Sequence, residues 1–354
     1  MKLFDRYLAR TVMATTLIVA FVLVGLYTFF SFVAELKNVG SGDYSLFKAG
    51  ITVLLEAPQG LYDIFPVIVL LGTLLGLGGL AAGSELVVLR ASGVSVLRMA
   101  GSALLAGVIL AGVCFGVGNW LAPHGAQLAQ RIRAHAHSGD AGALSGQSLW
   151  LRQGSDFVHI DRLLTDSRVA GIQLYQEGPG PSLSRIVTAR SARYEHGHWQ
   201  LHGVTVTRFG SGGVDVRDQQ QMQIAAHIKP KLLRLFVVQP QNLSTGGLYR
   251  YARFLRANDL DAGRYMLAFW RKLAMPVTVL VMILLAVPFA FGPLRSAGVG
   301  QRLFVGVLAG LAFYTFNEIV ANTGEVMGLT PWLTAWAPTA VLGVLALWRL
   351  RAAR

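Results

Sequence analysis

The sequence predicts a membrane bundle of about six transmembrane α-helices, interrupted once by an antiparallel β domain outside the membrane. Of the 354 residues, 53% are hydrophobic and 14% are charged, whereas an ordinary globular domain carries about 25% charged residues. The apolar residues gather in blocks long enough to cross a bilayer. Between the third and fourth blocks, short runs alternate between apolar and polar residues, which indicates strands. Residues 1–122 and 265–354 should each carry three spans, on either side of a β-rich domain with one helix at residues 123–264.

The first apolar block is predicted to be a permanent span rather than a cleaved signal peptide. It runs for about 24 residues, beyond the 7–15 residues of a signal core, and Phe32 stands where cleavage would need a small residue. Closely spaced glycines in the second and third blocks favour close contact between helices. The six spans are expected at about residues 11–34, 57–82, 99–121, 272–291, 303–321 and 332–348.

Lysine and arginine in the short loops predict the orientation, because such loops are cytoplasmic when they are basic. Both termini and the loop after the second span should then lie in the cytoplasm, with the β domain outside. Arg271 and Lys272, at the outer end of the fourth span, depart from the rule. The basic residues that carry the prediction are Lys2, Arg6, Arg10, Arg90, Arg98, Arg295, Arg302, Arg349, Arg351 and Arg354.

The middle segment carries strand and turn signals at the spacing of an antiparallel sandwich or roll. A helix should follow at residues 245–256, because Leu248, Tyr251, Ala252 and Leu255 fall on one face. The expected strands lie within residues 148–160, 171–175, 186–194, 199–209 and 222–228.

The motifs of an enzyme are missing from the sequence. No glycine is followed by lysine, so no Walker A loop can hold ATP phosphates. Cys114 is the only cysteine, and His196, His198 and His202 have no nearby ligand that would complete a metal site. The net charge of +13 is spread along the chain, which favours anionic lipid over nucleic acid as a partner. We therefore expect no enzyme activity, cofactor or metal.

The loop at residues 84–98 (SELVVLRASGVSVLR) should form a short amphipathic helix. Ser84 can cap it and Glu85 suits its first turn. The sequence leaves two interpretations open: a helix lying on lipid, or a coupling helix that docks into a cytoplasmic ATPase. The candidate coupling residues are Ser84, Glu85, Leu86, Leu89 and Arg90.

Polar groups mark the outer ends of three spans. Lys37 follows the first span, where it could snorkel or attract an anionic ligand. Glu318 lies near the outer end of the fifth span. Charged residues within a span usually face a bundle interior or a cavity. Pairing of Glu318 with Arg271 or Lys272 is the simplest structural expectation.

Four segments resemble the lipopolysaccharide export permeases of the LptF/LptG family, most of all its LptG branch. They are DRYLART at residues 5–11, SELVVLRASG at 84–93, DAGRYMLAFWRK at 261–272 and FGPLRS at 291–296, within a similarity over essentially the whole chain. The resemblance implies six spans with a periplasmic β-jellyroll, in the inner membrane of a Gram-negative bacterium. It implies a permease subunit that extracts lipopolysaccharide, paired with LptF, driven by ATP hydrolysis in an LptB dimer, and associated with LptC and the periplasmic bridge protein LptA.

The resemblance also implies site residues. Glu85 would contact the ATPase, and Lys37, helped by Arg271 and Lys272, would attract lipid phosphates. Ser31 and Asn38 stand where relatives often carry further basic residues. Spans one, two and five would line an acyl-chain cavity through Leu26, Phe30, Phe313 and Tyr314, with Glu318 nearby.

Two alternatives remain on the sequence alone. A lipoprotein-releasing or macrolide-type ABC permease would have four spans per chain. A membrane-anchored periplasmic scaffold without transport would need no coupling helix.

Overall fold

The computed structural model describes most of the chain and divides it into two compact units. One unit comprises Met1–Lys37, Ala49–Ala129 and Pro240–Arg354, and the other comprises Asn38–Lys48 and Gln130–Gln239. The described residues are 3–137, 149–153, 156–165, 167–178, 183–195, 197–210, 213–225, 239–257, 261–291 and 298–352.

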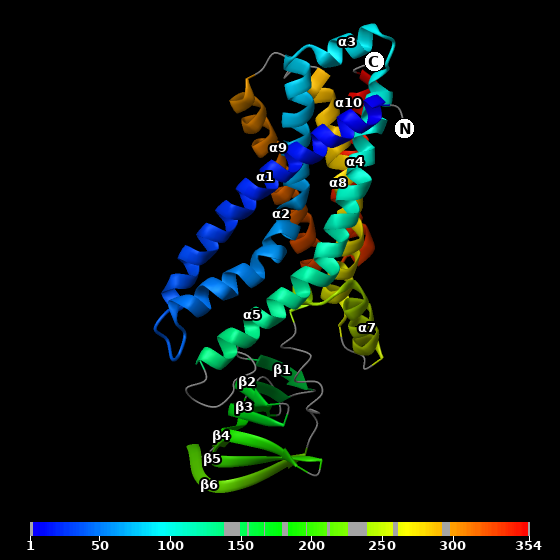
Figure 1. Cartoon of the computed structure of the whole chain (residues 1–354). Helices are drawn as coiled ribbons and strands as arrows, with labels where there is room; N and C mark the ends of the chain where they lie inside the picture. The colour runs from blue at the N-terminus through cyan, green and yellow to red at the C-terminus, as the bar shows by residue number, and fades with distance from the viewer. Residues whose placement is uncertain are drawn as a thin grey trace. The chain divides into compact units, whose positions relative to one another are not determined.

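Six helical segments in this described part are long and apolar enough to cross a membrane (Figure 1). This agrees with the six-span prediction and disagrees with a four-span permease. Each segment is longer than its predicted span, because polar residues continue the helices beyond the apolar blocks. The segments are α1 (Leu3–Glu35), α2 (Leu46–Ala82), α4 (Val96–Gly116) continuing into η2 and α5, α8 (Gly263–Phe291), α9 (Val299–Val326) and α10 (Pro331–Ala352).

The third span continues past the point where the sequence suggests its end. The composition changes at Pro123, but the α-helix of α4 passes into the π-helical segment η2 (Val117–Leu121) and then into α5 (Ala122–His137). Pro123 is the second residue of α5 and lies inside this continuous helix, so its missing N–H leaves one carbonyl of the preceding turn without a helical partner. The predicted boundary at residues 122–123 therefore lies within a continuous helical segment.

Glycines let the helices approach closely, as the sequence suggests for the second and third spans. A Cβ on Gly72 would lie 2.5 Å from Cα of Thr16 in α1, and the Thr15 hydroxyl donates to the Gly72 carbonyl at 2.7 Å. A Cβ on Gly107 would lie 2.7 Å from Ile283 of α8. Gly112 of α4, by contrast, faces open space.

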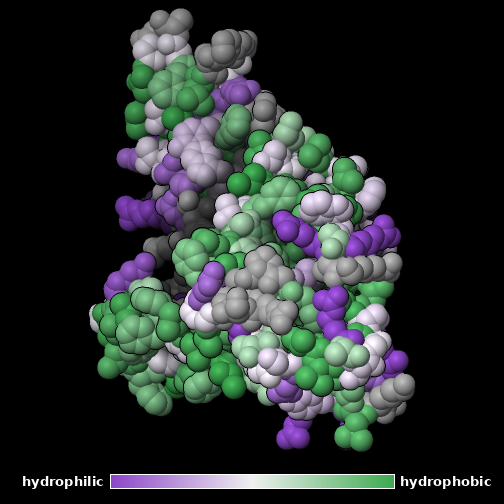
Figure 2. Space-filling model, turned by 90° about the horizontal axis from the view of Figure 1, so that it is seen from above, coloured by the Kyte–Doolittle hydropathy of each residue, from purple (hydrophilic) through white to green (hydrophobic). Residues whose placement is uncertain are grey.

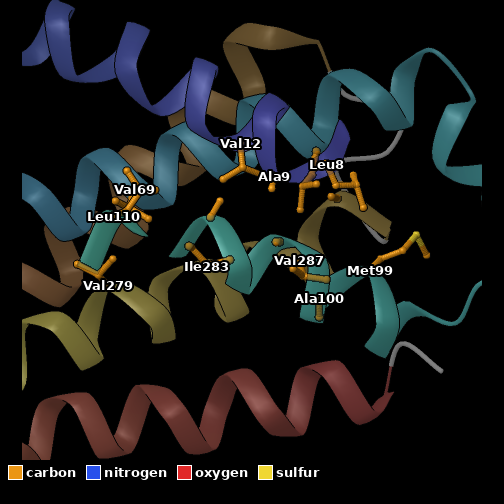
Figure 3. Packing of buried hydrophobic residues seen from close by; sticks show 14 of the residues in the cluster. Leu8, Ala9, Val12, Val69, Met99, Ala100, Leu110, Val279, Ile283 and Val287 are labelled. Atoms are coloured by element: carbon orange, nitrogen blue, oxygen red, sulfur yellow. The ribbon is translucent and has the colours of Figure 1, made fainter. Parts of the chain in front are cut away.

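The main apolar core of the helical unit lies between α1, α2, α4, α8 and the short helix α3 (Glu85–Ala91) (Figure 3). Leu8 and Leu350 belong to the same buried cluster. The beginning of α1 and the end of α10 therefore lie at the same end of the bundle (Figure 1).

Two short helices accompany the spans. α3 (Glu85–Ala91) follows α2. α7 (Thr245–Arg256) has the predicted bounds and buries Leu248, Ala252 and Leu255 of the predicted face, whereas Tyr251 is half-buried. The side chain of its N-cap residue, Ser244, accepts the N–H of Gly247. By its contacts α7 belongs to the helical unit.

The second unit contains an antiparallel β-sheet, as predicted. Its described strands pair in sequential order and do not close into a barrel. The predicted strand residues fall within β1 to β6, except residues 148, 154, 155 and 226–228, which lie outside the described residues. The strands are β1 (Leu149–Gln153), β2 (Asp156–Thr165), β3 (Arg168–Glu177), β4 (Leu183–Glu195), β5 (His198–Gly210) and β6 (Gly213–Ala225).

Glycines at positive φ interrupt the alternation of two strands. Gly171 in β3 (φ 65) and Gly203 in β5 (φ 64) both flank Arg190 of β4 in the pairing order. In β5 the buried residues change from odd positions (Trp199, Leu201) to even positions beyond the glycine. The interruption thus keeps apolar side chains on one face along the whole strand.

Candidate functional site

A cavity of about 510 Å³ lies between α2, α8, α9 and α10 within the helical unit. It contains five of the eight residues that the sequence suggests for the substrate: Arg271, Lys272, Phe313, Tyr314 and Glu318. Both apolar and charged side chains line it. Charged residues within membrane spans usually face a cavity of this kind. Further lining residues include Gln59, Asp63, Pro66, Val67, Arg264, Met275, Asn317 and Glu325.

The two arginines on the α8 side of this cavity are already paired with carboxylates. The Arg271 guanidinium forms an ion pair with the Glu318 carboxylate of α9, which confirms the expected pairing. Arg264 lies 4.0 Å from Glu325, also of α9. The two ion pairs therefore join α8 to α9 across the cavity.

Lys272 is 8% exposed and binds backbone rather than a carboxylate. Its ammonium donates to the carbonyl oxygens of Gly118 at 2.8 Å and Leu243 at 2.7 Å. The Gly118 carbonyl lies in η2, where the partner would be the N–H five residues on. That residue is Pro123, which has no N–H.

Lys272 thus supplies a donor that the π-helical segment lacks. The side-chain oxygen Oδ1 of the neighbouring Asn119 accepts the N–H of Thr245 at 2.8 Å. Hydrogen bonds therefore connect η2 both to α8 and to the start of α7. This geometry supports a structural role for Lys272, because two of its three ammonium donors already have backbone acceptors.

Asp63 of α2 is a cavity residue that the sequence reasoning missed. Its carboxylate lines the cavity and accepts a hydrogen bond from Gln59 Nε2 at 2.9 Å. A single carboxylate inside a long apolar block was the available signal, because ionisable residues within spans usually mark a cavity or a functional site.

α3 lies at the end of the bundle that carries both termini (Figure 1). Leu86 is buried in the core cluster and Leu89 packs against it, while Glu85 and Arg90 are exposed. The Glu85 carboxylate accepts a hydrogen bond from the Tyr7 hydroxyl of α1 at 2.9 Å.

The predicted cap and length of this helix are wrong in two respects. Ser84 occupies the N-cap position but makes no side-chain capping bond, because its backbone is left-handed (φ 62). The predicted segment also divides at Gly93: Arg98 belongs to α4, whose N-cap Ser95 accepts the Arg98 N–H. The helical periodicity of residues 84–98 does not show this break.

Comparison with known proteins places the chain in a family. The sequence profile of the "Lipopolysaccharide export system permease LptF/LptG" family matches residues 6–352. The chain belongs to the LptF/LptG permease family. It is 35% identical over 350 residues to the lipopolysaccharide export system permease protein LptG of Escherichia coli K12, covering 98% of this chain and 97% of that protein. It is 31% identical over 348 residues to LptG of Haemophilus influenzae, with the same coverage.

The remaining predicted substrate residues of this LptF/LptG permease lie on α1 or just after it, and none of them lines the cavity. Leu26 is 54% exposed and Phe30 is 62% exposed. Lys37 lies just beyond α1, in the 3-10 turn η1 (Leu36–Asn38), and is exposed. The structure therefore separates the α1 candidates from the α8 and α9 candidates.

The first turn of α2 in this permease carries another lysine near the end of α1 in the sequence. Lys48 forms an ion pair with Asp43. Its hydrogen bond and its charge lower the pKa of the Asp43 carboxyl. Lys48 is therefore neutralised locally, and Lys37 is the better candidate of these two for an anionic ligand.

Proposed function

We propose that this permease extracts lipopolysaccharide from the outer leaflet of a Gram-negative inner membrane and passes it through its periplasmic β domain toward the outer membrane. The observation that carries the proposal is the family match over residues 6–352. Relatives named as LptG permeases of a lipopolysaccharide export system, similar over nearly their whole length, support it. The chain acts as a transport subunit, and a partner hydrolyses ATP.

The exposed apolar faces of α1 and α9 support a paired permease. Only 6% of the most apolar stretch of α1 and 11% of that of α9 are buried, against 78% for α2. Figure 2, seen from the α3 end, shows hydrophobic side chains reaching the surface of the helical unit. We assign these faces to a cavity shared with the sister permease LptF, and LptC associates with the same assembly.

Acyl chains of the lipid would contact the exposed face of α1 at Leu26 and Phe30. Each methylene removed from water contributes about 0.8 kcal/mol, so a lipid with several acyl chains is held strongly. Lys37, at the end of the same helix, would attract the phosphates as a mobile point charge. Tyr314, 48% exposed on α9, would complete the apolar lining, with Phe313 facing the cavity behind it.

An LptB dimer would dock at α3, and LptA would receive the lipid at the other side of the membrane. α3, the start of α1 and the end of α10 lie at one end of the bundle. The proposal therefore places both termini in the cytoplasm and the β domain in the periplasm.

Lipid contact is tested by photo-crosslinking from positions 26, 30 and 37 in the assembled transporter. Lipopolysaccharide should crosslink at all three positions, and Lys37→Glu should retain less lipid than Lys37→Ala because it adds repulsion. Lys48→Ala is the matched control, since Lys48 is already paired with Asp43. No crosslink, together with unchanged lipid retention in Lys37→Glu, would contradict the site.

ATPase docking is tested by pull-down of LptB. Glu85→Lys should weaken the association because it reverses an exposed charge of α3. Asp215→Lys, a charge reversal on β6, should leave association unchanged. Undiminished association and transport in Glu85→Lys would mean that α3 only rests on lipid.

A further inference from the structure

A side-chain hydrogen bond connects the first turns of α1 to α3. The Tyr7 hydroxyl donates to Glu85 Oε2 at 2.9 Å, across 78 positions of sequence. The Tyr7 side chain is 48% exposed, so this residue is not placed there to fill the core. Its polar end is the part that meets another helix.

The beginning of α1 is the part of this helix that the bundle holds firmly. Leu8, Ala9 and Val12 are buried in the cluster that also contains Leu86 of α3 (Figure 3). Asp5 adds a second connection, accepting a hydrogen bond from the Ser102 hydroxyl of α4 at 2.6 Å.

Farther along α1, large apolar side chains are exposed, including Phe21 at 83% and Phe30 at 62%. α1 is thus held at the end next to α3 and packs on α2 near Thr16 and Val19, while only 6% of its most apolar stretch is buried. A displacement at the fixed end is carried along a rigid helix to the exposed face.

α3 is a short helix of 7 residues between two left-handed turns. Ser84 before it has φ 62 and Gly93 after it has φ 85; Ser84 is the only non-glycine residue with positive φ in the described part of the chain. Such a conformation is strained for a serine. Leu86 is the buried residue of α3, so α3 is anchored at Leu86, and Glu85 beside it connects to α1.

We infer that Tyr7 is a positioning residue that transmits movements of α3 to α1 through its hydrogen bond with Glu85. The inference rests on the proposed docking of the ATPase at α3. A carboxylate can accept several hydrogen bonds, so Glu85 can keep Tyr7 on Oε2 while Oε1 meets a basic group of the ATPase. Movement of the docked helix then reaches the α1 face proposed to hold acyl chains.

The test uses the assembled transporter with Tyr7→Phe, which removes only the hydroxyl. ATPase association, thermal stability and ATP hydrolysis should stay close to those of the parent. Lipopolysaccharide released per ATP hydrolysed should fall about fivefold, the lower end of typical coupling effects. Ser92→Ala is the matched control, because the Ser92 hydroxyl bonds only the Val88 carbonyl of the same helix among the bonds described. It should leave release per ATP unchanged.

A double variant tests whether Tyr7 acts through Glu85. If it does, adding Tyr7→Phe to Glu85→Gln should lower release per ATP by clearly less than fivefold. The inference is overturned if Tyr7→Phe releases lipid per ATP as the parent does, if its effect is the same in both backgrounds, or if stability and hydrolysis fall together with release. Failure of the docking proposal itself is seen separately, as intact LptB association in Glu85→Lys.

Discussion

Replacing Lys272 by methionine should destabilise the helical unit, although it removes a charge from a membrane span. Methionine keeps most of the apolar stem but has no donor for the Gly118 and Leu243 carbonyls, which Lys272 binds at 2.8 and 2.7 Å. A buried acceptor left without a partner costs about 1–3 kcal/mol, which gives about 2–6 kcal/mol for the two. Relief from burying the ammonium offsets part of this cost, so we expect a net loss of about 2 kcal/mol.

A loss of this size corresponds to a fall in Tm of about 4–8 °C, at about 2–4 °C per kcal/mol. Thermal unfolding of the purified permease in mild detergent measures it. Leu273→Met, a volume-conserving change at the next position of α8, is the control and should move Tm much less. A Lys272→Met variant as stable as the parent would show instead that the π-helical segment does not depend on the lysine.

Three further outcomes are expected. Gly72→Ala should lower Tm, because the new Cβ would meet the backbone of α1, and overpacking of this kind costs about 1–3 kcal/mol. Gly112→Ala is the control and should be neutral or stabilising, because Gly112 faces open space. Equal Tm values for the two variants would contradict the observed packing of α1 on α2. In a double-mutant cycle by thermal unfolding, Arg271→Gln and Glu318→Gln should each destabilise, and together by less than their sum, because they form one ion pair; strict additivity would contradict this. A topology reporter fused after Arg354 should report the cytoplasm, as the basic short loops predict; a periplasmic signal would reject the six-span topology.

The parts of the fold that depend on local composition could be predicted from the sequence. Six apolar blocks predict six spans, and alternation predicts the strands, because both signals lie within short windows. The pairing of Arg271 with Glu318 was also predictable, since two opposite charges near the same membrane boundary have few other partners.

The parts that depend on distant contacts could not be predicted. The Gly118 carbonyl is open to Lys272 because η2 is π-helical and because Pro123 lacks an N–H. A search for the α-helical period of 3.6 residues does not reveal a π-helical segment. The bond between Tyr7 and Glu85 joins residues 78 positions apart. Serine is a residue type that commonly caps helices. Ser84 makes no capping hydrogen bond, however, because its backbone is left-handed.

The same limit applies to the candidate site. The sequence grouped Leu26, Phe30 and Lys37 with Arg271 and Lys272 as one substrate site. The structure instead places the last two beside an internal cavity and leaves the α1 residues exposed. Which helices pack against which is decided by side-chain fit between distant segments, and a single sequence does not contain that information in readable form.

The proposed transport role is tested most directly by ATP-dependent release of lipopolysaccharide from vesicles that contain this permease together with LptF, LptB and LptC, with LptA as acceptor. Lipid should reach LptA only when ATP and this chain are both present, and Glu85→Lys should abolish the transfer while Lys37→Glu reduces it. Equal transfer from vesicles that lack this chain, or from vesicles with the Glu85→Lys variant, would contradict the proposed role.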